Sequence, residues 1–152
     1  MDMKRDILFR GKDLENGEWV YGYLIRVRYY LDEEKIRSII IPVETALYPR
    51  GEIGCLAFVN PETVGQFTGL VDKNGTKIFE GDIVNIEEHE HMVNGYYRVF
   101  YDEKSYGYAL QRDIEYHYNY FSFSELNGFA ETSEVIGNIH DNPELLKEAA
   151  NE

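Results

Sequence analysis

The sequence has 152 residues, 43% of them apolar, and a formal net charge of −13, which is enough apolar material for one ordinary domain or two small ones. Its single cysteine, Cys55, excludes an internal disulfide and a thiolate metal cluster, and we interpret it as a small buried hydrophobe. Residues 1–12 mix charges of both signs, and no run approaches the roughly 20 apolar residues of a membrane helix, so we expect a cytoplasmic protein without a membrane partner.

Charge is distributed unevenly along the chain. Residues 1–61 hold nine Lys or Arg and ten Asp or Glu, a net charge of −1, whereas residues 62–152 hold six and eighteen, a net charge of −12. Because nucleic-acid binding depends on cations that displace counterions from phosphates, we expect no nucleic-acid partner. The excess carboxylates favour solubility or a basic protein partner. The change near Pro61 predicts a β-rich N-terminal subdomain (1–61) and a second part (62–152).

Segments rich in β-branched and aromatic residues predict a mainly β fold. In chain order the predicted strands include residues 18–30, 37–43, 95–102, 106–112 and 133–140. Only the tail, residues 140–152, has a helical pattern, in which Asn142 is the predicted N-cap and Pro143 the first helical position. The sequence therefore predicts strands joined by tight turns, followed by a short C-terminal helix.

Four Asn-Gly dipeptides punctuate these segments, at 16–17, 74–75, 94–95 and 127–128. Asn followed by Gly favours a two-residue type I′ hairpin turn, because both residues tolerate positive φ. Around residues 74–75 this turn would place Asp72 opposite Lys77 and Val71 opposite Ile78. One cross-strand pair of opposite charge and one apolar pair support that register.

Residues 72–75 (Asp-Lys-Asn-Gly) also carry residue types found in calcium and phosphate loops. A calcium loop that started at Asp72 would need Gly at its sixth position and Glu at its twelfth, where the chain has Lys77 and Ile83. A phosphate loop would need a Gly-x-x-x-x-Gly-Lys-Ser/Thr spacing, which is absent here. We therefore predict a turn, after which Gly81 breaks the strand and a new strand over 83–91 runs to the third Asn-Gly turn.

The run Glu-Glu-His-Glu-His at 87–91 places His89 and His91 on one strand face, where two imidazoles could share a metal ion. The predicted hairpin places Arg98 opposite His91 and Phe100 opposite His89. A fixed cation beside a metal ligand opposes metal binding, so we interpret the run as a solvated strand face. No metal ion and no cofactor are expected.

Tyrosines dominate residues 96–120, and such aromatic strands either pack in a core or form an interface. A small barrel has too few interior positions for all of them, so some should reach the surface. Strand alternation places three of them on one face, and these are the candidate protein interface: Tyr116, Tyr118 and Tyr120.

Catalytic patterns are missing from the sequence. It has no Gly-x-Ser-x-Gly elbow and no His-Glu-x-x-His helix, and Cys55 has no histidine near it in sequence. Glu80 and Asp82 form a pair of carboxylates, but a pair alone does not define a cleft. The absence of such motifs favours a protein that is not an enzyme.

Several stretches together resemble one known family: residues 9–12 (FRGK), 17–24 (GEWVYGYL), 60–84 (NPETVGQFTGLVDKNGTKIFEGDIV) and 135–146 (VIGNIHDNPELL). They are similar to the YopX family of small proteins encoded by phages and prophages of low-GC Gram-positive bacteria. The resemblance implies a β-rich N-terminal part followed by a small SH3-like barrel. It implies no established activity and supplies no catalytic residues.

Three functions follow as hypotheses. The first is a non-enzymatic protein-binding or assembly module of phage origin in the bacterial cytoplasm, with a protein partner or a second copy of the chain as ligand. The second is a metal-dependent hydrolase that uses Glu80 and Asp82. The third is an acidic decoy that occupies a host DNA-binding protein.

Overall fold

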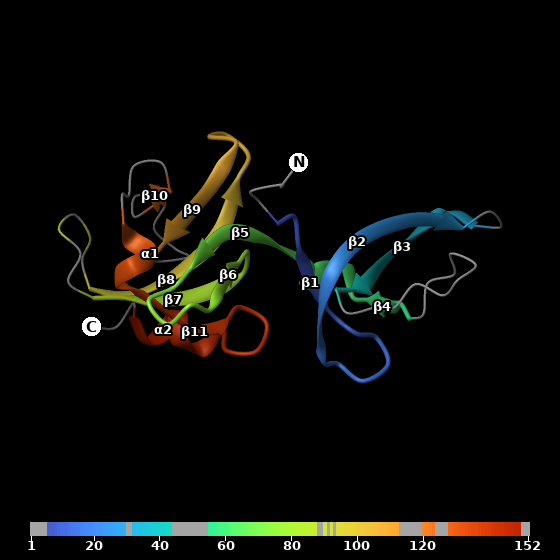
Figure 1. Cartoon of the computed structure of the whole chain (residues 1–152), viewed down its shortest axis with the longest axis horizontal. Coiled ribbons are helices and arrows are strands. Elements are labelled where there is room, and N and C mark those ends of the chain that lie inside the picture. The colour runs from blue at the N-terminus through green and yellow to red at the C-terminus, as the bar shows by residue number, and fades with distance from the viewer. Residues whose placement is uncertain are drawn as a thin grey trace. The chain divides into compact units, whose positions relative to one another are not determined.

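The computed structural model describes residues 6–29, 32–43, 55–87, 90, 92, 94–112, 120–123 and 128–149. The fold is mainly β, with two sheets, two short α-helices and one 3-10 helix within these ranges (Figure 1). One sheet has the strand order β4-β3-β2-β1-β5-β6 and the other β10-β9-β8-β7-β11. The chain divides into two compact units, Met1–Phe67 (unit 1) and Thr68–Glu152 (unit 2), with the boundary inside strand β5 (Gly65–Val71).

Unit 1 contains four strands, β1 (Phe9–Lys12), β2 (Trp19–Tyr29), β3 (Asp32–Pro42) and β4 (Ala57–Val59), and a 3-10 helix over Pro61–Thr63. Strands β2 and β3 form a long antiparallel hairpin, with β1 on one side and β4 on the other. Residues of one sheet face form the core, because successive side chains of a strand point to opposite faces. The core comprises Ile40, Ala57 and Val59, with Phe9, Val20, Leu24 and Val64 packed against them.

Strands β2 and β3 confirm the predicted strands over 18–30 and 37–43, but two features of unit 1 differ from the predictions. Strands β1 and β4 were not predicted, since four and three residues are too few to show alternation. Cys55, predicted to be buried, is exposed. It comes two residues before β4 begins, in a connection where its apolar neighbour Leu56 is also 47% exposed.

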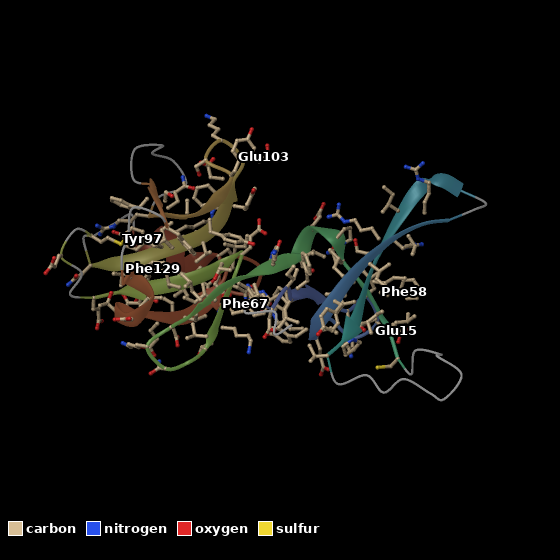
Figure 2. The ribbon with its side chains drawn as sticks, turned by 45° about the horizontal axis from the view of Figure 1, so that its top comes forward. Glu15, Phe58, Phe67, Tyr97, Glu103 and Phe129 are labelled. Carbon is tan, nitrogen blue, oxygen red and sulfur yellow. The ribbon has the colours of Figure 1, made fainter. Side chains whose placement is uncertain are left out.

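Unit 2 contains β6 (Lys77–Phe79), β7 (Asp82–Ile86), β8 (Gly95–Asp102), β9 (Gly107–Gln111), β10 (Tyr120–Ser122) and β11 (Ser133–Asn138). Two helices accompany them, α1 (Phe129–Thr132) and α2 (Glu144–Ala149). The aromatic side chains of Tyr97 and Phe129 are fully buried in this unit (Figure 2). They share one core cluster with Ile78, Val84, Ile86, Met92, Val99 and Leu110.

The predicted strands over 95–102, 106–112 and 133–140 are confirmed by β8, β9 and β11, and the C-terminal helix by α2. The predicted cap residue is engaged elsewhere, because Asn142 Oδ1 accepts a hydrogen bond from the backbone N–H of Asn138 at 3.3 Å. Helix α1 was not predicted. The described strands form two antiparallel sheets, which confirms a mainly β fold, and they do not close into a barrel.

The type I′ prediction is wrong at the three Asn-Gly dipeptides whose residues are all described. Only the glycines have positive φ: +73° at Gly17, +81° at Gly75 and +143° at Gly95. At the second dipeptide the Gly75 N–H donates to Asp72 O and the Asp72 N–H to Thr76 O. The connection therefore has three residues with a single left-handed glycine, and Asp72 faces Thr76 rather than Lys77.

The predicted strand over 83–91 is also too long, because β7 ends at Ile86. Ile86 pairs with Gly95 and Ile83 with Arg98, so eight residues separate the last paired residues instead of the two of a tight turn. Arg98 is therefore not opposite His91, as the tight turn required. His89 and His91 themselves lie outside the described residues.

Candidate functional site

The turn at residues 72–75 is built around the carboxylate of Asp72, which is only 5% exposed. Its Oδ1 accepts the backbone N–H groups of Asn74 at 2.8 Å and Thr76 at 2.9 Å. Its Oδ2 accepts the N–H of Val135, 63 residues further along the chain, at 2.9 Å. The carboxylate thus closes its own turn and ties that turn to β11.

Burial alone would raise the pKa of Asp72, but the hydrogen bonds from the backbone of Val135, Thr76 and Asn74 outweigh it and leave the pKa below its ordinary value. Two contacts of Lys73 add to the junction: its N–H donates to Ser133 O at 3.0 Å, and its Nζ lies 2.8 Å from Glu134 Oε2. Both oxygens of the Asp72 carboxylate already accept hydrogen bonds from backbone donors. This arrangement agrees with the predicted structural turn.

A second junction follows at Gly81, whose φ is +85°. The Gly81 N–H donates to Val99 O, and its carbonyl accepts the N–H of Ile139, both at 2.9 Å. The side chain of Asn138 accepts the N–H groups of His140 and Asp141 at 3.0 Å. The contacts of the two junctions join residues 72–81 to residues 133–139 through hydrogen bonds that hold the sheet.

The carboxylate of Asp82 lies inside this network. It is 1% exposed, and its Oδ2 accepts the N–H of Phe79 at 2.7 Å across the turn at Glu80 and Gly81. No group of three His, Cys, Asp or Glu side chains that could hold a metal ion occurs within the described ranges. The geometry of Asp82 is therefore that of a residue that fixes the bend between β6 and β7.

The tyrosine-rich segment divides between core and surface. Tyr97 is buried, and burial raises the pKa of its phenol, an effect that the neighbouring Arg112 partly offsets. Tyr108 is half-buried, and its ring centroid lies 5.5 Å from that of Tyr101 and 5.9 Å from that of Phe123. Tyr101 and Tyr106 are 43% and 85% exposed.

The three tyrosines predicted to form an interface cannot be placed as a group. Tyr116 and Tyr118 lie outside the described residues. Tyr120 begins β10, where its backbone pairs with Gln111.

A larger exposed apolar surface, which sequence reasoning missed, lies in unit 1 on the sheet face opposite the core. We call it the outer face. Its members are identified by cross-strand pairs, since directly paired residues share a face: Tyr21 pairs with Arg10, Tyr23 with Ile41, Ile25 with Ile39, and Ile39 with Phe58. Its large side chains are well exposed: Tyr21 45%, Tyr23 53%, Ile25 40% and Phe58 38%.

Where the structure describes their side chains, the charged residues of the outer face are cations. They are Arg10, Lys12 and Arg37, which pair with Tyr21, Trp19 and Val27. Arg10 and Lys12 lie over the indole of Trp19, with centroid distances of 4.7 and 5.4 Å. Such cation–π contacts hold the positive charges close to the aromatic surface.

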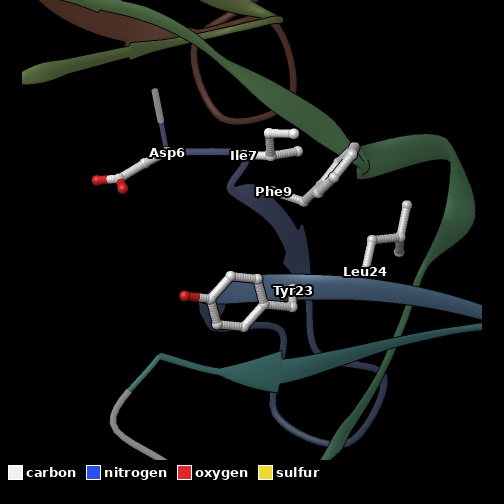
Figure 3. A pocket seen from close by; sticks show the side chains of 5 residues that line it. All are labelled: Asp6, Ile7, Phe9, Tyr23 and Leu24. Carbon is white, nitrogen blue, oxygen red and sulfur yellow. The ribbon is translucent and has the colours of Figure 1, made fainter. Parts of the chain in front are cut away.

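A pocket of about 270 Å³ opens beside Tyr23 (Figure 3). Its walls are apolar, formed by Ile7, Phe9, Tyr23 and Leu24, and the carboxylate of Asp6 adds one polar group. Its volume lies just below the roughly 300–1,000 Å³ of pockets that hold drug-sized ligands. The pocket therefore suits a single side chain better than a cofactor.

The sequence stretches that form the two hydrogen-bonded junctions lie within the range matched by a known protein family. A family model described as YopX protein matches residues 8–147. The chain belongs to the YopX family. The matched range of this YopX protein includes both junctions, the outer face and most of the pocket.

One solved structure similar to this YopX-family chain is the crystal structure of protein EF1440 from Enterococcus faecalis. The two sequences are 24% identical, the match covers 93% of this chain and 99% of that one, and the TM-score is 0.56. At that identity the similarity concerns the fold. No curated protein matches the chain. None of the described helices is long and apolar enough to cross a membrane.

Proposed function

We propose that this YopX-family protein is a non-enzymatic protein-binding or assembly module of phage or prophage origin that acts in the cytoplasm of a bacterial host. The outer face of unit 1 is the observation that supports the proposal. Four large apolar side chains there are each more than a third exposed, three of them on β2 and Phe58 on β4, and Ile39 of the intervening strand β3 pairs with both Ile25 and Phe58. Contiguous exposed apolar surface of this kind usually marks an interface with another protein.

The charge distribution is consistent with a protein ligand. Exposed tyrosines at the rim of an apolar patch and cations that lie on an indole suit a partner that brings apolar and acidic groups. The net charge of −12 over residues 62–152 favours a second proposal, an acidic decoy that occupies the basic site of a host DNA-binding protein. The two proposals use different parts of the chain and can be tested separately.

A metal-dependent hydrolase at Glu80 and Asp82 has no observation in its favour, since the Asp82 carboxylate is buried and accepts a backbone hydrogen bond. A thermal-shift screen with Mg²⁺, Mn²⁺ and Zn²⁺ tests this alternative. We expect no metal-dependent rise in melting temperature, and a rise that the Asp82→Asn variant loses would restore the hydrolase.

The finer fold assignment is proposed in the same way. We expect unit 2 to belong to the SH3-like small barrels, on the strength of the family resemblance and of its short strands joined by tight turns. An experimental structure in which the edge strands of this sheet pair with each other would support that assignment.

The central test is affinity capture from cells that carry the prophage, with two purified variants compared with the native protein. Tyr21→Ser combined with Ile25→Ser removes apolar surface from the outer face, while Glu131→Ser changes an exposed residue of α1. We expect the double variant to lose a partner that the control retains. The triple replacement of Tyr116, Tyr118 and Tyr120 by Ser tests the other candidate surface. Equal capture by all variants would contradict binding at either surface.

A further inference from the structure

Tyr106 has a backbone conformation that its side chain disfavours. Its φ is +53°, and it is the one non-glycine residue with positive φ among those described. Bulky side chains are rarely found there, because the Cβ approaches backbone atoms, and such outliers concentrate at functional sites. Its side chain is 85% exposed, so packing within the chain does not compensate for the strain.

The chain contains the same kind of turn without this strain. The β1–β2 and β8–β9 connections each begin with an aspartate, Asp13 or Asp102, whose Oδ1 accepts the N–H two residues later. In both, the residue four positions after the aspartate has positive φ: Gly17 in the first and Tyr106 in the second. Because glycine has no Cβ, only the second turn is strained. The tyrosine is therefore suited to a contact outside its own chain.

The turn that carries Tyr106 also projects charge. Figure 2 shows Glu103 at the tip of the β8–β9 hairpin, and the turn contains the carboxylates of Asp102 and Glu103 with one lysine, Lys104. An exposed aromatic ring beside carboxylates thus forms a compact projection. Single aromatic anchors of this type often dominate the affinity of an interface.

Unit 1 carries the complementary surface. Its pocket of about 270 Å³ has four apolar walls and one carboxylate, that of Asp6, which can accept a hydrogen bond from a phenol. The charged side chains described on the adjacent outer face are the cations Arg10, Lys12 and Arg37, of which Arg10 is only 6% exposed. Two outer faces in direct contact would bring cation against cation, whereas the hairpin tip brings acidic groups.

We infer that the occupant of the pocket is Tyr106 of a second copy of this chain, which inserts from the β8–β9 hairpin. The inference rests on the proposed function and names the partner. Because one copy supplies the hairpin and the other the pocket, the contact is heterologous, so that the first copy keeps a free pocket and the second a free hairpin. Self-association should then weaken with added salt.

Two variants separate the two halves of this contact. Tyr106→Gly removes the anchor and relieves the backbone strain. Ile7→Glu places a charge in the pocket at a residue that is 51% exposed. Leu14→Glu is its matched control, a residue of unit 1 that is 54% exposed and does not line the pocket. Lys104→Gly is the control for the turn.

Sedimentation equilibrium over a wide concentration range should show native self-association, with at least tenfold weaker binding in Tyr106→Gly and Ile7→Glu, as expected when a central aromatic anchor is lost. Both control variants should associate like the native chain. An equimolar mixture of the two weak variants should form a 1:1 heterodimer, because one retains the pocket and the other the hairpin. The melting temperature of Tyr106→Gly should equal or exceed that of the native chain.

A native chain that stays monomeric overturns the inference. The proposed function would still stand if affinity capture finds a different protein partner. Self-association that Tyr106→Gly does not change also overturns it. A mixture that fails to form the heterodimer excludes the hairpin-to-pocket contact even if both single variants are weak. A melting temperature that falls in Tyr106→Gly would assign the tyrosine to the fold of its own unit.

Discussion

Single residues in unit 2 hold its chain connections by satisfying backbone donors. Asp72 accepts three N–H groups while it is almost completely buried. A buried polar atom without a partner is costly, so the value of this carboxylate lies mainly in the donors it satisfies. The same reasoning applies to Asp82 and the N–H of Phe79.

The Asp72→Asn variant should show how this carboxylate links stability to pH. The folded-state pKa lies below the ordinary value of 3.8, so the carboxylate stabilises the fold above that value and loses its effect as the pH falls through the folded-state pKa. We expect a cost on the order of 1–3 kcal/mol at pH 7, because donors lose their ionised acceptor. Urea unfolding from pH 7 to pH 2 should show the difference from the native chain shrink below about pH 4. A stability difference that stays constant with pH would contradict the role of the carboxylate's charge. The control Glu131→Gln changes an exposed side chain and should have little effect on the free energy of unfolding.

Gly75→Val tests the left-handed glycine in the 72–75 turn. An added Cβ at Gly75 meets no atom within 4 Å, so the cost arises from its φ of +81° alone. We expect a loss of roughly 1–3 kcal/mol in the free energy of unfolding. Gly107→Val is the matched control, since its Cβ would lie 3.9 Å from Ser105 O and its φ is not positive. Equal effects of the two substitutions would remove conformational strain as the explanation.

The sequence was sufficient to predict the long strands, but not the type and register of the turns between them. Segments such as residues 18–30 and 95–102 contain enough aromatic and β-branched residues to identify β2 and β8. Asn-Gly fits both a type I′ turn and a turn with one left-handed glycine, so the dipeptide predicts a turn without its register. The residues after Ile86 lacked any signal that would have ended the predicted strand there.

The outer face could not be predicted because β2 is apolar on both of its faces. Tyr21, Tyr23 and Ile25 alternate with Val20, Gly22 and Leu24 along this strand. Alternation shows which residues share a face, but neither set is polar, so it leaves open which face is buried. The strain at Tyr106 was equally hidden, since a residue type does not specify its φ.

The hairpin of β2 and β3 depends on Gly22, a β2 residue that pairs with Phe9 of β1 on one side and Pro42 of β3 on the other. An added Cβ at Gly22 would overlap the backbone carbonyl of Ile41. Gly22→Ala should therefore lower the melting temperature of the protein by several degrees, because backbone atoms of a packed sheet cannot move aside cheaply. Ile25→Ala, on the exposed outer face of the same strand, should have a much smaller effect in the same thermal scan. Comparable shifts for both would mean that β2 tolerates displacement.

At the scale of the whole molecule, charge decides which ligands are compatible. The second part of the chain, residues 62–152, carries −12, and the cations of the outer face are few and two of them lie on Trp19. We expect no change in fluorescence anisotropy when labelled duplex DNA or single-stranded RNA is titrated at physiological salt. Binding at micromolar concentration would contradict this, and loss of that binding in Lys12→Ala would locate it on the outer face.

The contact between Asp72 and Val135 also sets an order on the synthesis of the protein. Strand β11 pairs with β7 and supplies the N–H that Asp72 accepts, yet it begins only at residue 133 of 152. During translation β7 leaves the ribosome long before its neighbour exists, and its buried Ile83, Val84 and Ile86 belong to an edge without a partner. The nascent chain therefore passes through an interval in which the edge of β7 is unpaired and open to pairing with another chain.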